Sequence, residues 1–220
     1  MYVQQWQHFH RCNDPVMTNT PSKVLLQIGL GSVLLHMLVL MAMFYCTGYH
    51  WISYILLDNP WFGGVTTVLL LVEHAVWLHL LWEFAYGQAC SLTLAFLGVL
   101  ILVASWVMEL IIPTEPDPYG LHPIFCIAFV VGCTLNLIGV LLLLPGKRHG
   151  VDPSYKYITA GLGLVGVICS AVWVAWWRLK HSLQLPPWKI EQTMQITAYI
   201  TYLAGLAVTL DFWLQQPTPL

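Results

Sequence analysis

The sequence predicts an all-α membrane protein with six transmembrane helices, and two observations support this fold class. The 220-residue chain is 58% hydrophobic and only 8% charged, with a mean hydropathy of +0.72, whereas a soluble domain is about a quarter charged. It also contains six apolar stretches of bilayer-crossing length, since about 20 helical residues span a hydrocarbon core of about 30 Å. They cover residues 24–45, 62–86, 89–112, 123–145, 157–177 and 193–213.

Little of the chain lies outside these stretches, so we expect a single membrane domain. A polar N-terminal segment covers 1–23, the six-helix domain covers 24–214, and a tail covers 215–220. The first residues lack the basic-then-apolar layout of a cleaved signal peptide, so we expect the first helix to be retained.

The connections between the stretches are short. Asp58-Asn59-Pro60 is a turn signal before the second stretch, and Gly87-Gln88 leaves so tight a link that the second and third helices should form an antiparallel hairpin. The first connection also allows a re-entrant helix at 47–57, because about ten apolar residues are too few to span. The other three connections are polar: an acidic one at 113–122, a basic one at 146–156, and a Pro-containing one at 178–191.

Basic residues are distributed unequally between the two sides of the predicted bundle. With six helices both termini share a side. Five basic residues lie on that side and three on the other, and this favours cytosolic termini. The first group is Arg11, Lys23, Lys147, Arg148 and Lys156, and the second is Arg178, Lys180 and Lys189.

The six cysteines do not form a disulfide framework. Five lie in or beside apolar stretches and none is in a C-x-x-C pair, so we expect free thiols that pack as small hydrophobes. Cys12 lies in the polar N-terminal segment and is a weak candidate for lipidation.

The second stretch is unusual because it carries Glu73, His74, His79 and Glu83 within eleven residues. At 100° per residue, the two glutamates and His79 share an arc of about 120°, whereas His74 points elsewhere. His79 and Glu83 are spaced i, i+4 and can satisfy each other within one helix.

Further ionisable groups lie in the other stretches: His36 in the first, Glu109 in the third and Asp211 in the sixth. An ionised carboxylate in hydrocarbon costs about 2.5–3.5 kcal/mol, so such groups must pair, protonate or face a polar cavity. Glu83, Glu109 and Asp211 are close to predicted helix ends, where water can also reach them.

Four interpretations of these groups stay open. They pair across helices to hold the bundle together, form an ion or proton pathway, line a pocket for a lipid headgroup, or bind a metal or haem. The metal candidates are His36, His74, His79 and His122. We predict no cofactor, and expect bound lipid.

Small and amide residues predict close helix contacts. Residues 161–166 match G-x-G-x-x-G, but no strand precedes them, so the nucleotide-binding interpretation fails. We expect these glycines, the pair Gly29 and Gly31, and the pair Gly132 and Gly139 to let helices approach. Asn136 should form an interhelical hydrogen bond. The sequence has no nucleophile–base pair and no phosphate loop, so nothing positive indicates an enzyme.

Three places resemble the six-span superfamily that includes the DRAM autophagy modulators, the Sfk and Frag proteins and the GPI-lipid-remodelling PGAP proteins. The clearest runs from the third stretch to the fourth, where a short polar loop precedes His122, Ala128, Phe129 and Gly132. The second is the aromatic end of the sixth stretch, with Asp211-Phe212.

The third place is Trp51-Ile52-Ser53 with Pro60, which is similar to the family's ISD…PP loop. The chain departs from the family pattern at Tyr54, where the family has Asp, and at Glu191, which lies about three residues earlier than the family's Glu-Trp and precedes Gln192.

The resemblance implies a non-enzymatic or lipid-handling role: a scaffold or regulator that interacts with lipids, and cytosolic termini. Two other functions stay open from the residues alone. One is an accessory subunit of a large respiratory or photosynthetic complex, and the other is a transporter or haem-binding redox protein that uses the histidines and glutamates of the second stretch. We expect membrane lipids and other membrane proteins as partners, and no nucleic acid.

Overall fold

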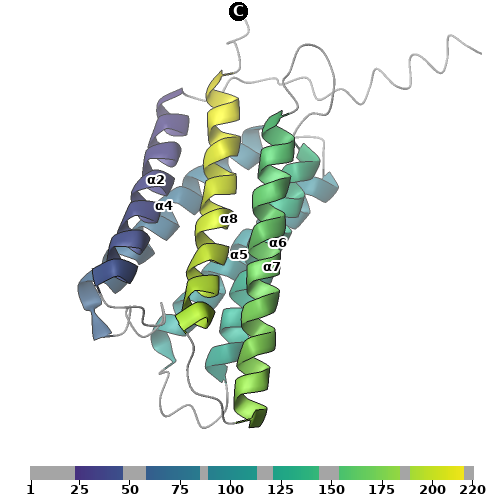
Figure 1. Cartoon of the computed structure of the whole chain (residues 1–220). Helices are drawn as coiled ribbons and strands as arrows, with labels where there is room; N and C mark the ends of the chain where they lie inside the picture. The colour runs from purple at the N-terminus through teal and green to yellow at the C-terminus, as the bar shows by residue number, and fades with distance from the viewer. Residues whose placement is uncertain are drawn as a thin grey trace, which may run out of the picture.

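The computed structural model describes residues 23–46, 58–84, 89–112, 121–143, 154–183 and 189–215. These segments form six helices, with no strand among the described residues (Figure 1). The helices are α2 (Lys23–Cys46), α4 (Pro60–Phe84), α5 (Ala89–Ile111), α6 (Leu121–Leu143), α7 (Ser154–Leu183) and α8 (Lys189–Gln215). All six are long and apolar enough to cross a membrane. The predicted all-α six-helix fold is confirmed, and the chain is a multi-pass integral membrane protein.

The helices and the apolar stretches differ mainly at their ends. α7 continues six residues beyond the predicted end at 177, and α8 begins four residues before 193. Hydropathy marks only the part of a helix that lies in hydrocarbon, whereas the backbone hydrogen bonds continue into the interfacial region.

Several sequence predictions lie outside the described residues. These are the re-entrant helix at 47–57, the Trp51-Ile52-Ser53 element with Tyr54, the lipidation candidate Cys12, and the loop residues Arg11, Lys147 and Arg148 in the charge comparison.

The helices form a closed ring in chain order. Each helix packs against the next, and α8 returns to pack against α2. Successive helices are antiparallel, so α2 begins and α8 ends at the same end of the bundle (Figure 1). α8 is the most enclosed span. Its inner face carries Tyr199, Tyr202, Leu203, Leu206 and Leu210, all at most 4% exposed.

The closest helix pair is α5 with α6, and glycine is the reason. A Cβ built on Gly132 would lie 2.6 Å from the backbone nitrogen of Leu102, and one on Gly139 would lie 2.6 Å from that of Ala95. Only a residue without a side chain permits this approach. Asn136 lies between the two glycines, and its Nδ2 donates to the Ala95 carbonyl at 3.0 Å, which confirms the predicted interhelical bond.

The prediction is only partly right for the other glycines. A Cβ on Gly29 would meet Val76 at 2.9 Å, and one on Gly166 would meet Thr201 at 2.9 Å. A Cβ on Gly31 or Gly161 would meet nothing within 4 Å. The prediction was therefore wrong for these last two, because their positions face out of the bundle.

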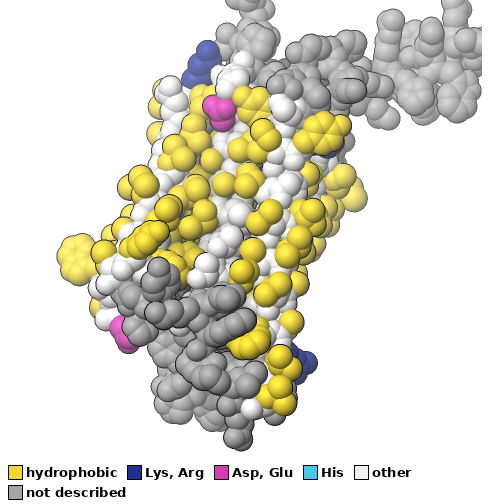
Figure 2. Space-filling view, in the orientation of Figure 1, with side chains coloured by type: hydrophobic (Ala, Val, Ile, Leu, Met, Phe, Trp, Pro, Cys, Tyr) yellow, Lys and Arg dark blue, Asp and Glu magenta, His cyan; other side chains and the backbone are white. Residues whose placement is uncertain are grey.

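Apolar side chains also cover the outside of the bundle. Figure 2 shows hydrophobic side chains along the whole length of the visible helices and charged ones near the two ends. Leucine and valine side chains on several helices are at least half exposed, for example Leu38, Val68, Leu100 and Leu164. In water this surface would be costly, whereas acyl chains solvate it well. The protein therefore contacts membrane lipids along these faces.

Candidate functional site

A buried acid–histidine pair joins α2 to α4. The Nδ1 of His36 lies 3.1 Å from both Oε1 and Oε2 of Glu73. His36 is 0% exposed and Glu73 is 2% exposed. Each residue is near the middle of its helix, so the pair lies near the bilayer midplane. There a carboxylate needs a partner, and His36 supplies an N–H donor to it.

His74 extends this pair toward α8. Its Nδ1 donates to the Leu70 carbonyl at 2.8 Å and lies 3.4 Å from Oε1 of Glu73, while its Nε2 lies 2.8 Å from the Tyr202 hydroxyl. The helical-wheel interpretation set His74 apart from Glu73, and this was wrong, because the two side chains are in contact. α4 packs against both α2 and α5, so its buried arc is wide enough to enclose two adjacent residues.

The other two members of the predicted second-stretch group are His79 and Glu83. His79 lies on the exposed face of α4. The side chain of Glu83 lies outside the described residues. The predicted His79–Glu83 pair therefore stays a prediction.

The network continues from Tyr202 into the α5–α6 pair. The Tyr202 hydroxyl lies 3.4 Å from Oδ1 of Asn136, and Nδ2 of the same amide donates to the Ala95 carbonyl. The resulting chain of polar contacts reaches α2, α4, α8, α6 and α5. Because the Leu70 carbonyl only accepts, Nδ1 of His74 carries a proton. In the neutral ring Nε2 accepts from Tyr202, and in the protonated ring it donates to Tyr202, which then donates to Asn136.

Aromatic rings surround the free edge of His36. Its ring meets those of Tyr199 and Trp106 edge-to-face, with centroids 5.4 Å and 6.5 Å away. Within the described part of the chain, Nε2 of His36 and the hydroxyl of Tyr199 have no hydrogen-bond partner. Both residues are almost fully buried. Unpaired buried polar atoms are uncommon, and they mark places where water or a ligand can bind.

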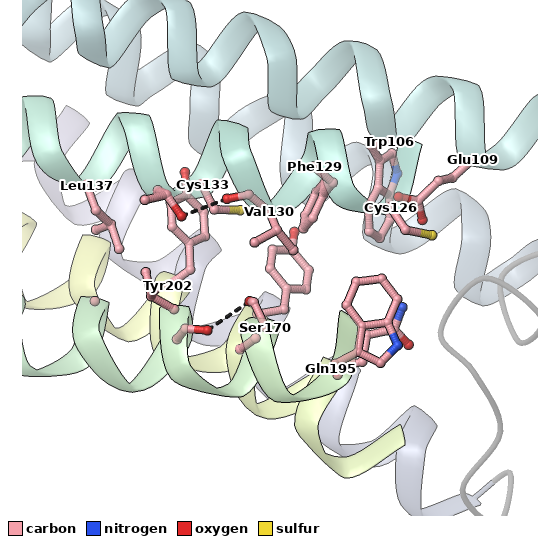
Figure 3. Close-up of a pocket in the computed structure, with 17 residues that line it drawn as sticks. Trp106, Glu109, Cys126, Phe129, Val130, Cys133, Leu137, Ser170, Gln195 and Tyr202 are labelled. Carbon is pink, nitrogen blue, oxygen red and sulfur yellow. Dashed lines mark hydrogen bonds between the residues drawn. The ribbon is translucent and has the colours of Figure 1, made fainter. Parts of the chain in front are cut away.

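A cavity of about 50 Å³ lies beside this network, between α6, α7, α8 and the end of α5. Tyr199 and Tyr202 line it and so connect it to the histidines. Figure 3 shows Glu109 and Cys126 together at one end of the cavity, and Leu137 and Tyr202 at the other. Its walls are mostly apolar, with a few polar side chains among them, including Glu109, Ser170 and Tyr202.

Glu109 is the carboxyl group of this cavity. It is only 6% exposed, and its hydrogen-bond partner is the thiol of Cys126. Its position two residues before the end of α5 indicated access to water, but the start of α6 and the rings around it enclose it. Sequence position along one helix cannot reveal that enclosure.

Asp211 lies apart from both the network and the cavity. The Tyr155 hydroxyl donates to its Oδ2 at 3.2 Å and Nε2 of Gln215 donates at 2.8 Å, near the ends of α7 and α8. The neighbouring Phe212 is buried, with its ring 5.2 Å from that of Tyr155. The family-like Asp-Phe pair therefore joins α8 to α7. The third family-like position, His122, is half-buried at the start of α6.

The candidate metal ligands do not converge. No group of three or more His, Cys, Asp or Glu side chains suited to a metal occurs in the described segments. Both nitrogens of His74 are engaged in hydrogen bonds, His79 lies on the outer face of α4, and His36 has one nitrogen left.

Several site residues were missed by sequence reasoning. These are Tyr199 and Tyr202 on α8, Trp106 on α5 and Gln195 near the start of α8. Hydroxyl-bearing rings in the middle of an apolar span were a usable signal, because a buried tyrosine needs a partner for its hydroxyl. No comparable signal distinguishes Trp106 from the other tryptophans.

Comparison with known proteins returned no match from protein-family models, curated proteins or solved structures.

Proposed function

We propose that this integral membrane protein is a non-enzymatic, lipid-interacting regulator of the DRAM, Sfk and Frag type, and that it binds part of an amphipathic molecule in the cavity between α6, α7 and α8. The observation that carries the proposal is the composition of that cavity. Apolar and aromatic walls suit the alkyl groups of such a molecule, and a few polar groups among them suit its polar atoms, which is the usual composition of a small-molecule site.

The packing around the cavity also favours an amphipathic occupant. α5 packs closely on α6, and α7 closely on α8, whereas α6 and α7 contact each other less. The cavity lies at this weaker seam. Gly163 and Gly166 contribute no side chain to the α7 wall, which leaves room between the two helix pairs. A chain attached to a bound head group can therefore pass between α6 and α7 to the lipid.

Lipid retained through purification tests this proposal. The full-length protein is purified in a mild neutral detergent, and bound lipid is quantified by native mass spectrometry. Gly163→Leu places a side chain at the cavity wall, where a Cβ already lies 3.5 Å from Leu137. Gly161→Leu is the matched control, two residues away on the same helix, where a Cβ meets nothing within 4 Å.

We expect bound lipid in the wild type and the control, and loss of it in Gly163→Leu. Retention of the same lipid by Gly163→Leu, or purification of the wild type free of lipid, would count against the proposal.

Proton-coupled transport is the second candidate, and one observation favours it. Four titratable groups, His36, Glu73, His74 and Tyr202, are linked by contacts of 2.8–3.4 Å from the midplane to the cavity wall. Such chains of ionisable groups inside membranes are typical of proton relays. In liposomes with an internal pH dye, Tyr202→Phe should abolish any proton flux, whereas Tyr155→Phe should not. Equal flux in protein-free liposomes would eliminate this candidate.

A further inference from the structure

We propose that the cavity binds a quaternary ammonium group, in which the nitrogen is fully alkylated, as in choline-type head groups. This inference rests on the proposed function, since it names the chemistry of the occupant. It is carried by three features of the cavity wall: a buried carboxyl group, a cluster of aromatic rings, and a hydroxyl without a partner.

The carboxyl group of Glu109 can pair with a cation. It is buried at one end of the cavity, beside Cys126 (Figure 3). Among the described residues its side chain has the Cys126 thiol as its hydrogen-bond partner and no ion-pair partner. A thiol is a weak donor. A cation bound beside it would stabilise the ionised form of this buried carboxyl group.

Aromatic rings provide the second half of a cation site. Trp106, Phe129 and Tyr199 form one contiguous cluster, with ring centroids 5.0–5.9 Å apart. Trp173 lines the cavity from α7. The faces of such rings attract alkylated ammonium groups within about 6 Å of a centroid, and Trp does so most strongly. An apolar ligand would contact the rings alone, and the thiol of Cys126 would remain the partner of Glu109.

The size of the cavity agrees with this ligand class. A water molecule needs about 10–15 Å³ measured in the same way, so the cavity takes roughly four waters, comparable to one trimethylammonium group. Its volume is about 50 Å³. The described lining residues include no Lys, Arg or His, so an anionic group would meet Glu109 without compensation.

The Tyr199 hydroxyl can donate a hydrogen bond to an oxygen of such a ligand. Its residue is 3% exposed, it lines the cavity, and it has no partner among the described residues. In choline-type molecules an oxygen lies two carbons from the nitrogen. That oxygen can accept a hydrogen bond from Tyr199 while the nitrogen lies among the rings.

The test compares a cation with its uncharged isostere. The full-length protein in dodecyl maltoside is titrated with choline and with 3,3-dimethylbutan-1-ol, which has the same shape without the charge, and tryptophan fluorescence is recorded. Choline should bind saturably, and the neutral alcohol about tenfold more weakly. Glu109→Gln should reduce this difference to what the aromatic rings alone provide. Asp211→Asn should preserve it, because that carboxylate is bonded to Tyr155 and Gln215 outside the cavity.

A second variant covers the case in which Glu109→Gln fails to fold. Trp173→Phe keeps an aromatic ring but weakens the cation contact, so choline affinity should fall severalfold while the affinity for the neutral alcohol changes little. Two further titrations identify the source of the ammonium group. Binding of lysophosphatidylcholine without binding of free choline indicates a lipid head group, and binding of both indicates that the free cation is also accepted.

Three results would overturn the inference: measurable but equal affinity for choline and the neutral alcohol, unchanged selectivity in Glu109→Gln, or no preference for lysophosphatidylcholine over lysophosphatidylglycerol. If one of these results occurs while Gly163→Leu loses the lipid that the wild type retains, the ammonium inference fails and the proposed function survives. If Gly163→Leu also retains lipid, both fail.

Discussion

Replacing His36 by Leu should strongly destabilise the bundle, because it leaves Glu73 without its main partner. Both side chains are fully buried, and Nδ1 of His36 lies 3.1 Å from each carboxylate oxygen. A hydrogen bond to a charged group contributes about 1.5–3 kcal/mol. Removing one partner of a buried pair costs about 3–5 kcal/mol. His74, with Nδ1 3.4 Å from Glu73, keeps part of the interaction, so we expect a loss of about 3 kcal/mol in unfolding free energy.

A double-mutant cycle separates this effect from the loss of packing. The variants are His36→Leu, Glu73→Met and the double variant, unfolded by a denaturing detergent and followed by tryptophan fluorescence. Replacing both partners by apolar residues is often close to neutral for a buried ion pair. The double variant should therefore be more stable than His36→Leu alone, with a coupling energy of about 2 kcal/mol or more. Additive losses in the cycle, or a loss below about 1 kcal/mol in His36→Leu, would refute the reasoning.

Two further substitutions test other contacts of the bundle by the same unfolding measurement. Gly132→Ala should lower the unfolding free energy by about 1–3 kcal/mol, because its Cβ would lie 2.6 Å from the backbone nitrogen of Leu102. Gly31→Ala, where a Cβ meets nothing within 4 Å, is the control and should be neutral or stabilising. Equal effects at both sites would show that the close approach of α5 and α6 does not depend on the missing side chain of Gly132. Tyr202→Phe should cost about 1–3 kcal/mol, because it removes the partner of Nε2 of His74, 2.8 Å away; an unchanged stability would mean that another group satisfies this nitrogen.

Properties that depend on local composition could be predicted from the sequence. The six spans, their order and the antiparallel arrangement follow from apolar length and short connections. The interhelical bond of Asn136 and the close approach at Gly132 and Gly139 were also predictable. In an apolar span an amide side chain needs a hydrogen-bond partner on another helix, and small residues allow two helix backbones to approach.

The partners of the polar groups were harder to predict from the sequence. A helical wheel gives the angle between two side chains on one helix, but not the rotation of that helix within the bundle or the width of its buried arc. For this reason His74, set apart by the wheel, became the link to Tyr202, while His79 faces outward. Gly31 and Gly161 face outward for the same reason.

By itself, the sequence determined that this chain is a six-helix membrane protein with more ionisable groups in its spans than hydrocarbon tolerates unpaired. Only the tertiary structure decided that Glu73 pairs with His36 and His74, and that Glu109 lies in a cavity among aromatic rings. The physical reason is that the free energy of transferring a segment into the bilayer is approximately a sum of contributions from its individual residues. Pairing and enclosure, in contrast, depend on which faces of different helices meet.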